Sequence, residues 1–207
     1  MKTKICGIQS VTDAQMVIKS GADYIGLNFV RSSKRRVTMD VAHQITQFIH
    51  ATPSDIKTVG VFQNQTSDYV NMLADNLGLD FVQLHGNEMP SYCTQIERPV
   101  IKAFALDSDF NVEETYRHMS NYHVAYYLVD RKVQGEGDVL SVDRLAELAV
   151  RLPFFLAGGL TLQNIHSIVL AVKPYGIDVA RGVETDQKID EEKVHSIITS
   201  CNKYETS

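Results

Sequence analysis

The sequence predicts a (β/α)8 barrel, and two observations support that prediction. Short apolar runs rich in β-branched residues recur along the 207 residues. Their near-continuous hydrophobicity is typical of strands buried on both faces, as in a parallel sheet. Segments with helical periodicity lie between them, and strand–helix alternation repeated about eight times is the pattern of this barrel. A doubly wound open sheet is the second possibility, because local pattern does not show whether a sheet closes.

The predicted strands are the apolar runs themselves. They cover residues 3–6, 24–29, 58–62, 81–84, 100–104, 125–129, 154–157 and 176–179. No Gly-x-Gly-x-x-Gly motif follows an early strand. This weakens a dinucleotide-binding open sheet and favours the barrel.

The predicted helices have apolar residues on one face and a capping residue before the first turn. Thr38 is the expected N-cap of a helix that buries Val41, Ile45, Phe48 and Ile49. The other predicted faces are Val70, Leu73 and Leu77 after Ser67; Leu145, Leu148 and Leu152 after Ser141; Ile165, Ile168, Val169 and Val172 after Thr161; and Val194, Ile197, Ile198 and Cys201 in the last helix.

Composition limits the class of protein. The chain has 44% hydrophobic and 22% charged residues, which is typical of a globular protein. We expect one domain over residues 1–207, with its last few residues frayed. A formal net charge of −5 disfavours a nucleic-acid binder, despite the basic cluster at residues 31–36.

The same sequence argues against a membrane or secreted protein. It has no apolar run near the roughly 18 residues of a transmembrane helix and no signal-peptide core. Its three cysteines are an odd number without metal-site spacing, and the histidines other than His85 have no ligand spacing. We therefore expect a cytoplasmic protein with no disulfides and no metal.

Barrel enzymes carry their chemistry at the carboxyl ends of the strands. Cys6 ends the first predicted strand, where a thiol can act as a base or nucleophile or can serve as a small buried hydrophobe. Asp130 follows the sixth strand, where partial desolvation would raise the pKa of its carboxyl group and suit it to proton donation. A turn-capping role for Asp130 is equally compatible with the sequence.

Phosphate often binds the loops after the seventh and eighth strands of such barrels. Gly158 and Gly159 follow the seventh strand, and Gly182 and Val183 follow the eighth, where a short helix could present N–H groups to an anion. The basic cluster at 31–36 fits either a solvated loop or an arginine clamp for a substrate anion. His85 lies at a strand end and is a candidate pocket residue.

These residues resemble the phosphoribosylanthranilate isomerase family of tryptophan biosynthesis. The resemblance is carried, in order, by Lys4-Ile-Cys-Gly-Ile8, Gly21-Ala-Asp-Tyr-Ile-Gly-Leu-Asn-Phe29, Ser33-Lys-Arg35, Gly60-Val-Phe62, Val82-Gln-Leu-His-Gly86, Leu128-Val-Asp130, Ala157-Gly-Gly-Leu160, Ile177-Asp-Val179 and Gly182-Val-Glu184. Each block is short, but the ordered set covers essentially the whole chain.

The resemblance implies a cofactor-free Amadori rearrangement of N-(5′-phosphoribosyl)anthranilate. Asp130 matches the general acid that protonates the ring oxygen, and Cys6 matches the general base that removes the C2′ proton. Arg35 matches the arginine that positions the anthranilate carboxylate. The remaining implied substrate-binding residues are Gln83, His85, Asp178 and the phosphate-holding Gly158, Gly159, Gly182 and Val183.

The chain departs from the family pattern at three places. The usual Gly-Gly-Thr/Ser-Gly loop is replaced by Gly135-Glu-Gly-Asp-Val-Leu-Ser-Val142, with the acidic residues Glu136 and Asp138. Ala180 and Arg181 stand where small hydroxyl or amide residues are usual, and we expect Arg181 to give the phosphate a charged contact. Arg36 occupies an often aromatic position, so both Arg35 and Arg36 are candidates for the carboxylate clamp.

Two alternatives remain open at this level. One is another phosphosugar isomerase or epimerase on the same barrel, because a fold does not fix a function. The other is a non-catalytic protein that binds a phosphorylated ligand. The expected partner is a small phosphorylated molecule in either case, with no nucleic acid and no membrane, and the sequence is compatible with a monomer or a homodimer.

Overall fold

The sheet closes into a barrel. The computed structural model describes residues 1–132 and 140–202. Eight parallel strands pair in chain order, and β1 returns to pair with β8, with Lys4 opposite Asp178. The strands are β1 Lys2–Cys6, β2 Tyr24–Asn28, β3 Lys57–Phe62, β4 Phe81–Leu84, β5 Val100–Leu106, β6 Tyr126–Arg131, β7 Phe154–Leu156 and β8 Gly176–Val179. The prediction of a (β/α)8 barrel is confirmed, and the open sheet is wrong.

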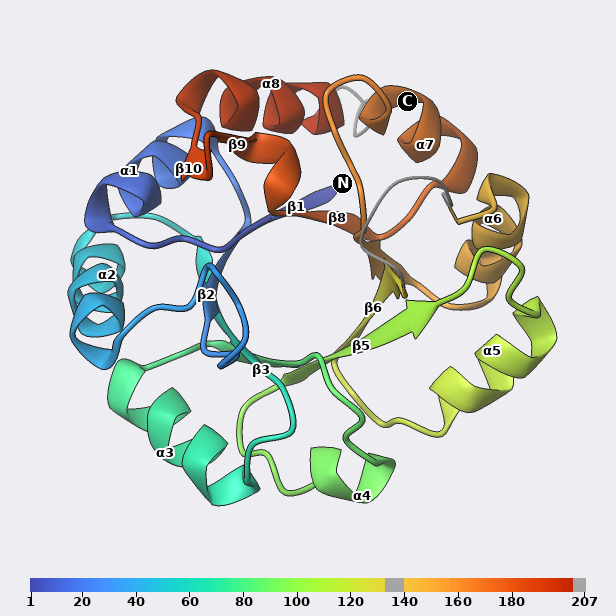
Figure 1. The fold of residues 1–207 in the computed structure, drawn as a ribbon, viewed down its shortest axis with the longest axis horizontal. Helices are drawn as coiled ribbons and strands as arrows, with labels where there is room; N and C mark the ends of the chain where they lie inside the picture. Colours follow the sequence, from blue (N-terminus) through green and yellow to red (C-terminus); the bar gives the residue numbers. More distant parts are fainter. Residues whose placement is uncertain (133–139, 203–207) are drawn as a thin grey trace.

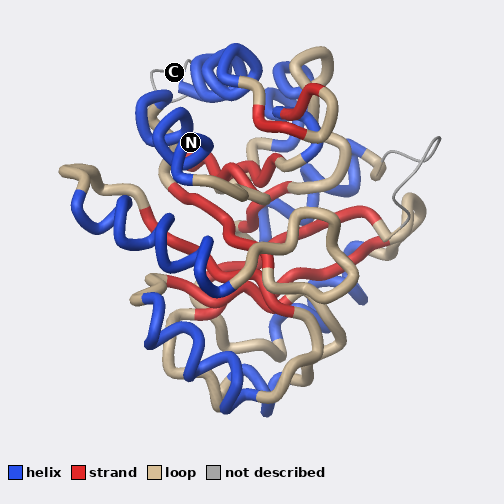
Figure 2. The backbone as a smooth tube through the Cα atoms, turned by 60° about the vertical axis from the view of Figure 1, so that its left-hand side comes forward, coloured by secondary structure: helices blue, strands red, loops and turns tan. Residues whose placement is uncertain are grey.

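Helices form an outer ring around the barrel (Figure 1). They are α1 Val11–Ser20, α2 Met39–Ala51, α3 Ser67–Leu77, α4 Pro90–Cys93, α5 Val112–Ser120, α6 Val142–Arg151, α7 Ile165–Val172 and α8 Glu191–Asn202. A 3-10 helix, η1 (Arg181–Val183), follows β8, and a small antiparallel pair, β9 (Glu184–Thr185) and β10 (Lys188–Ile189), leads into α8. The side view in Figure 2 shows the strands enclosed between helices.

Most predicted elements are confirmed, with corrections at their ends. Thr38 and Ser141 cap α2 and α6 by accepting the backbone N–H groups of Val41 and Arg144. Ser67 is instead the first residue of α3, and Asn164 rather than Thr161 is the N-cap of α7. The apolar stripe of the last helix is buried as expected.

The predicted set omits α1, α4 and α5, because each buries few apolar residues. Cap signals could have found two of them. Ser10 accepts the N–H of Asp13 at the start of α1, and Gly21 ends that helix in the left-handed conformation. Asn111 is the N-cap of α5, where its side chain accepts the N–H of Glu114.

Aromatic rings fill the amino-terminal end of the barrel. Tyr24, Phe81, Tyr126, Phe155 and Tyr175 contact one another with ring centroids 5.0–6.5 Å apart. A second apolar layer packs between the strands and the helices. A packed interior at this end is general for such barrels, so a ligand site has to lie at the opposite, carboxyl-terminal end of the strands.

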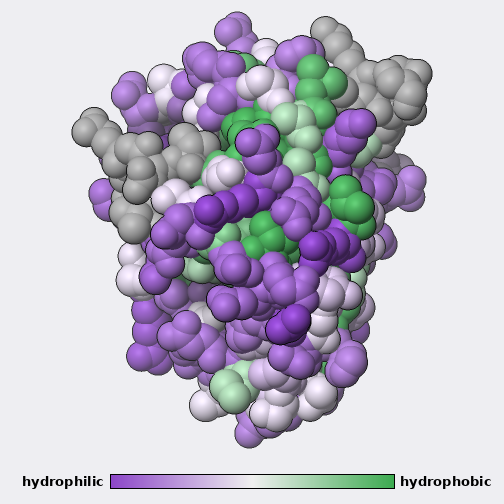
Figure 3. Space-filling model, turned by 90° about the vertical axis from the view of Figure 1, so that its right-hand side faces the viewer, coloured by the Kyte–Doolittle hydropathy of each residue, from purple (hydrophilic) through white to green (hydrophobic). Residues whose placement is uncertain are grey.

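The outer face that carries α5, α6 and α7 is predominantly hydrophilic, with smaller apolar areas between polar side chains (Figure 3). Val150 and Leu170 are two exposed apolar residues of α6 and α7. No helix in the described part of the chain is both long and apolar enough to span a membrane.

Candidate active site

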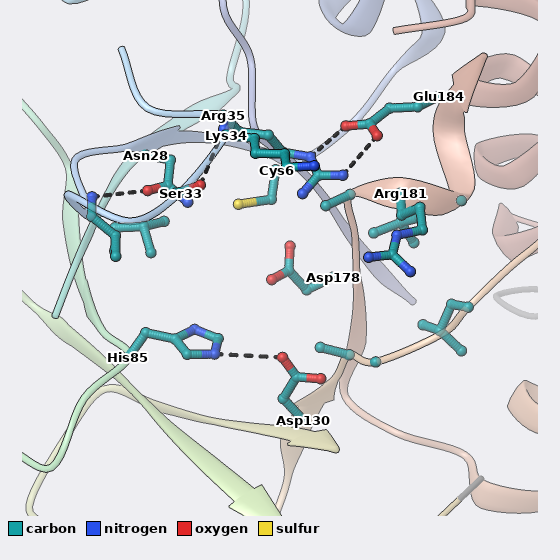
Figure 4. Close-up of a pocket in the computed structure, with 18 of the residues that line it drawn as sticks. Cys6, Asn28, Ser33, Lys34, Arg35, His85, Asp130, Asp178, Arg181 and Glu184 are labelled. Atoms are coloured by element: carbon teal, nitrogen blue, oxygen red, sulfur yellow. Dashed lines mark hydrogen bonds and ion pairs between the residues drawn. The ribbon is translucent and has the colours of Figure 1, made fainter. Parts of the chain in front are cut away.

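A cavity of about 950 Å³ opens at the carboxyl ends of the strands. Its lining includes nearly all of the predicted site residues: Cys6, Arg35, Gln83, His85, Asp130, Gly158, Gly159, Asp178, Arg181 and Gly182. Cys6 and Asp130 lie on opposite sides of this cavity, with Asp178 between them (Figure 4). Strand ends that are far apart in the sequence therefore converge on one space.

Asp130 is held by its own loop and by His85. It lies in β6, one residue before the strand ends, and its Oδ1 accepts the N–H of Arg131 at 2.8 Å. Its Oδ2 is 3.4 Å from His85 Nε2, while His85 Nδ1 is 3.1 Å from the amide nitrogen of Gln83. Because an amide nitrogen only donates, Nδ1 is the acceptor and Nε2 carries the proton that faces Asp130. Gln83 and His85 thus present a donor to the carboxyl group.

Cys6 ends β1 with its thiol in the cavity and only 8% of the residue exposed. Burial is the largest influence on this group and raises the pKa of the Cys6 thiol; the Lys4 ammonium opposes that effect, and Asp178 adds to it. The thiol is therefore mostly protonated at neutral pH. Cys93 and Cys201 are also free and buried, but they lie outside the cavity lining.

Arg35 enters the cavity from the loop after β2. Its Nε and Nη2 both donate to the Glu184 carboxylate, with Nη2 2.7 Å from Oε2, and this pairing raises the pKa of Arg35. The pair leaves three of the five guanidinium N–H groups for a ligand. The side chain lies across Gly7, where a Cβ would collide with Arg35 Cδ. Arg36 is exposed and is not part of the cavity lining.

The loop after β7 presents free backbone N–H groups. Gly158 and Gly159 both have positive φ, and a Cβ on Gly158 would lie 2.5 Å from Asp130 Oδ1. Among the described residues, neither glycine N–H has a hydrogen-bond partner. Glycine at these two positions therefore allows both the turn and the close approach of Asp130.

The segment after β8 agrees only partly with the expectation. Gly182 lines the cavity, and Arg181 projects toward the same space as Asp178 (Figure 4). Within the described residues, the guanidinium group of Arg181 has no hydrogen-bond or ion-pair partner, while its backbone carbonyl accepts the N–H of Glu184. Val183 does not reach the cavity: its side chain is fully buried in the core, and its N–H donates to Ala180.

Sequence reasoning missed Arg131 and the roles of Lys4 and Glu184. Arg131 lines the cavity, and its guanidinium lies over Gly159, where a Cβ would be 3.1 Å from Cζ. Its Nε is buried without a partner among the described residues. The signal was its position directly after Asp130, at a strand end. In the sequence, Lys4 and Glu184 stand out only as members of the family motifs.

Two further expectations concern the atypical loop at residues 135–142 and the absence of a metal site. Gly135, Glu136 and Asp138 lie outside them, and Val142 is the first residue of α6. Within residues 1–132 and 140–202, no cluster of His, Cys, Asp and Glu has the arrangement of a metal site.

The fold and the site together define a class: barrel enzymes that gather titratable side chains and free backbone N–H groups at the carboxyl ends of the strands. Comparison with known proteins narrows that class. The model of a family described as N-(5′-phosphoribosyl)anthranilate (PRA) isomerase matches residues 3–200. The chain belongs to this family.

Individual relatives agree with the family assignment. The N-(5′-phosphoribosyl)anthranilate isomerase of Geotalea daltonii is 37% identical, over 95% of this chain and 94% of that protein. A multifunctional tryptophan biosynthesis protein of Schizosaccharomyces pombe is also 37% identical, over 97% of this chain but only 29% of that longer protein.

Solved structures match over nearly the whole fold. The phosphoribosylanthranilate isomerase of Thermus thermophilus superposes with a TM-score of 0.85 at 30% identity, covering 99% of this chain and 100% of that one. A phosphoribosylanthranilate isomerase in complex with reduced 1-(o-carboxyphenylamino)-1-deoxyribulose 5-phosphate has the same TM-score at 28% identity, covering 98% and 99%.

Proposed function

We propose that this chain, as one catalytic domain, converts N-(5′-phosphoribosyl)anthranilate to 1-(2-carboxyphenylamino)-1-deoxyribulose 5-phosphate in tryptophan biosynthesis, without a cofactor. The observation that carries the proposal is the convergence of Asp130, Cys6 and the free N–H groups of Gly158 and Gly159 on one cavity. The family to which the chain belongs supports the choice of substrate. The three cysteines of the chain are unpaired and so fit a reducing compartment, which supports a cytoplasmic location.

Asp130 is the general acid of the first step. It donates a proton to the ribose ring oxygen as the bond between that oxygen and C1′ breaks, and the nitrogen lone pair forms the C1′=N bond of a protonated imine. The carboxylate left on Asp130 accepts hydrogen bonds from His85 Nε2–H and from the backbone N–H of Arg131. Hydrogen bonds to the charged form of a carboxyl group stabilise that form, so both partners assist release of the proton.

Cys6 is the general base of the second step. Its thiolate takes the proton from C2′, the C2′–H electron pair forms a C1′=C2′ bond, and the C1′=N electrons return to nitrogen. The resulting enolamine becomes the ketone when the C2′ hydroxyl loses its proton and C1′ gains one. An acid and a base on opposite sides of the cavity suit one proton transfer to the ring oxygen and another from C2′ (Figure 4).

Binding of the two anionic ends orients the reacting carbons between these groups. The free N–H groups of Gly158 and Gly159 hold the phosphate, and Arg131 and Arg181 place positive charge beside that loop. Arg35, fixed by Glu184, offers its remaining donors to the anthranilate carboxylate. Lining position and exposure favour Arg35 over Arg36 for this role.

The test of the proposed function is a fluorescence assay. Phosphoribosylanthranilate is generated in situ from anthranilate and phosphoribosyl pyrophosphate, and loss of its fluorescence is followed with the purified protein. We expect rapid loss that depends on protein concentration. Loss no faster than the uncatalysed hydrolysis would contradict the proposal.

Replacement of Arg181 by Ser is expected to raise the substrate KM by roughly 10- to 100-fold, with a smaller effect on kcat, because a charged hydrogen bond contributes about 1.5–3 kcal/mol. Steady-state kinetics measure the change. Arg117→Ser is the matched control, since Arg117 is an exposed residue of α5 paired with Glu113. An unchanged KM in Arg181→Ser would show that Arg181 does not contact the phosphate.

Replacement of Arg35 by Ala is expected to raise the KM by at least about 10-fold. The substitution removes the donors for the anthranilate carboxylate. It also leaves the Glu184 carboxylate without its partner, so that Glu184 and the anthranilate carboxylate repel each other. Arg36→Ala is the comparison and should leave the KM unchanged, because Arg36 lies outside the lining. If Arg36→Ala gave the larger increase, the carboxylate would be held by Arg36.

A further inference from the structure

Lys4 is a buried charge at the base of the candidate active site. Its side chain is 0% exposed, and its Nζ lies 2.9 Å from Asp178 Oδ1. The two residues are opposite each other in the β1–β8 ladder. Burial alone would lower the pKa of the Lys4 ammonium, but the attraction of Asp178 and Cys6 outweighs it and raises that pKa. Lys4 therefore keeps its proton.

The Lys4 ammonium group and the Cys6 thiol lie beside the same residue of the neighbouring strand, and each affects the pKa of the other. Lys4 and Cys6 are two residues apart on β1, so their side chains point to the same side of the sheet, into the barrel. Gly26 of β2 stands opposite Cys6. A Cβ at Gly26 would lie 2.7 Å from Cys6 Sγ and 3.0 Å from Lys4 Nζ. The thiol and the ammonium group converge over this glycine, with no side chain of β2 between them.

The charged groups that act on the Cys6 thiol come from three elements. Lys4 on β1 has the largest effect in favour of the thiolate, Arg35 from the loop after β2 acts in the same direction, and Asp178 on β8 acts against it. Glu184 neutralises much of Arg35 through their ion pair. An ammonium group has three N–H donors, and Asp178 occupies one of them.

We propose that Lys4 is a positioning residue that acts as the counter-ion of the Cys6 thiolate, and that Asp178 competes with the thiolate for the same ammonium group. The inference rests on the proposed function, in which Cys6 is the base. During the reaction the C2′–H bond breaks, an S–H bond forms, and the electron pair moves into the C1′–C2′ bond. Lys4 retains its proton throughout and stabilises the sulfur only while it is negative.

The test measures ionisation of Cys6 without any substrate. The intact protein is treated with iodoacetamide at a series of pH values, and mass spectrometry follows alkylation at each cysteine separately, because only the thiolate reacts. In Lys4→Met, alkylation of Cys6 should be at least about 10-fold slower at pH 8, and its midpoint should move to higher pH, since a neighbouring opposite charge changes a pKa by 1–3 units.

Asp178→Asn should move the Cys6 midpoint in the opposite direction, to lower pH, because it removes the competing carboxylate. This second variant also tests the proposal if Lys4→Met does not fold. Alkylation of Cys93 and Cys201 serves as the internal control, since both thiols are buried outside the cavity and unfolding would expose all three. The proposal would be overturned if the pH midpoint of Cys6 alkylation moved in the same direction in both variants, or if it moved in neither.

Activity measured on the same samples separates this inference from the proposed function. If the midpoint is displaced in Lys4→Met but the wild-type protein does not convert phosphoribosylanthranilate, the role of Lys4 stands and the proposed function is wrong. An active enzyme whose Cys6 profile is the same in wild type and Lys4→Met would retain the function and reject the role of Lys4.

Discussion

Asp130→Asn is expected to lower kcat by about 10²–10⁴-fold, the usual contribution of a general acid, while the KM changes by only a few-fold. An amide has the shape of the carboxyl group but cannot donate a proton to the ring oxygen. Asparagine keeps one acceptor oxygen for the N–H of Arg131, and only the contact of the other carboxyl oxygen with His85 Nε2 is lost. The fold and the substrate site should therefore persist, and the loss should lie in the chemical step.

Steady-state fluorescence kinetics and binding of a reduced product analogue measure the two parts of this prediction. Asp107→Asn is the matched control, because Asp107 follows β5 at the same end of the barrel but is exposed and paired with Lys132. Control and wild type should have equal kcat. Near-normal turnover in Asp130→Asn would remove the general-acid role, whereas lost analogue binding would assign Asp130 to binding.

Cys6→Ser is expected to reduce kcat by a similar factor of about 10²–10⁴. Serine has nearly the shape of cysteine, but its hydroxyl does not ionise in the working pH range, so the C2′ proton loses its acceptor. In the wild type, kcat should rise with pH until the thiol is ionised, because burial raises the pKa of Cys6 and only the thiolate is a base. Cys6→Ser should lose this rise.

A pH series of kcat for wild type, Cys6→Ser and Cys93→Ser tests this prediction. Cys93 is a buried thiol outside the cavity, so Cys93→Ser controls for the effect of a buried hydroxyl on stability, which thermal unfolding records. Cys93→Ser should keep the wild-type pH profile. If Cys6→Ser kept it too, the base would be another group.

Local sequence determined the strands and several helix ends. The runs at residues 81–84 and 176–179 coincide with β4 and β8, because a strand buried on both faces is mostly apolar; Gln83 and Asp178, which line the cavity, are the polar residues in them. Thr38 and Ser141 were predictable caps, since each satisfies an N–H group only three residues away. The order of motifs along the chain, with Cys6 and Asp130 at strand ends, is enough to indicate the family.

Only the tertiary structure decided which of these groups act together. Lys4 pairs with Asp178 across 174 residues, and Arg35 pairs with Glu184 across 149. Each pair exists because the barrel closes and the strand register brings its members to one level, which no local pattern encodes. The pairing of β6 with β7 brought Arg131 over Gly159, and tertiary packing placed Val183 in the core. The sequence alone identified the chemical groups of the site. Closure of the barrel formed the ion pairs that determine the charge of these groups and their position in the cavity.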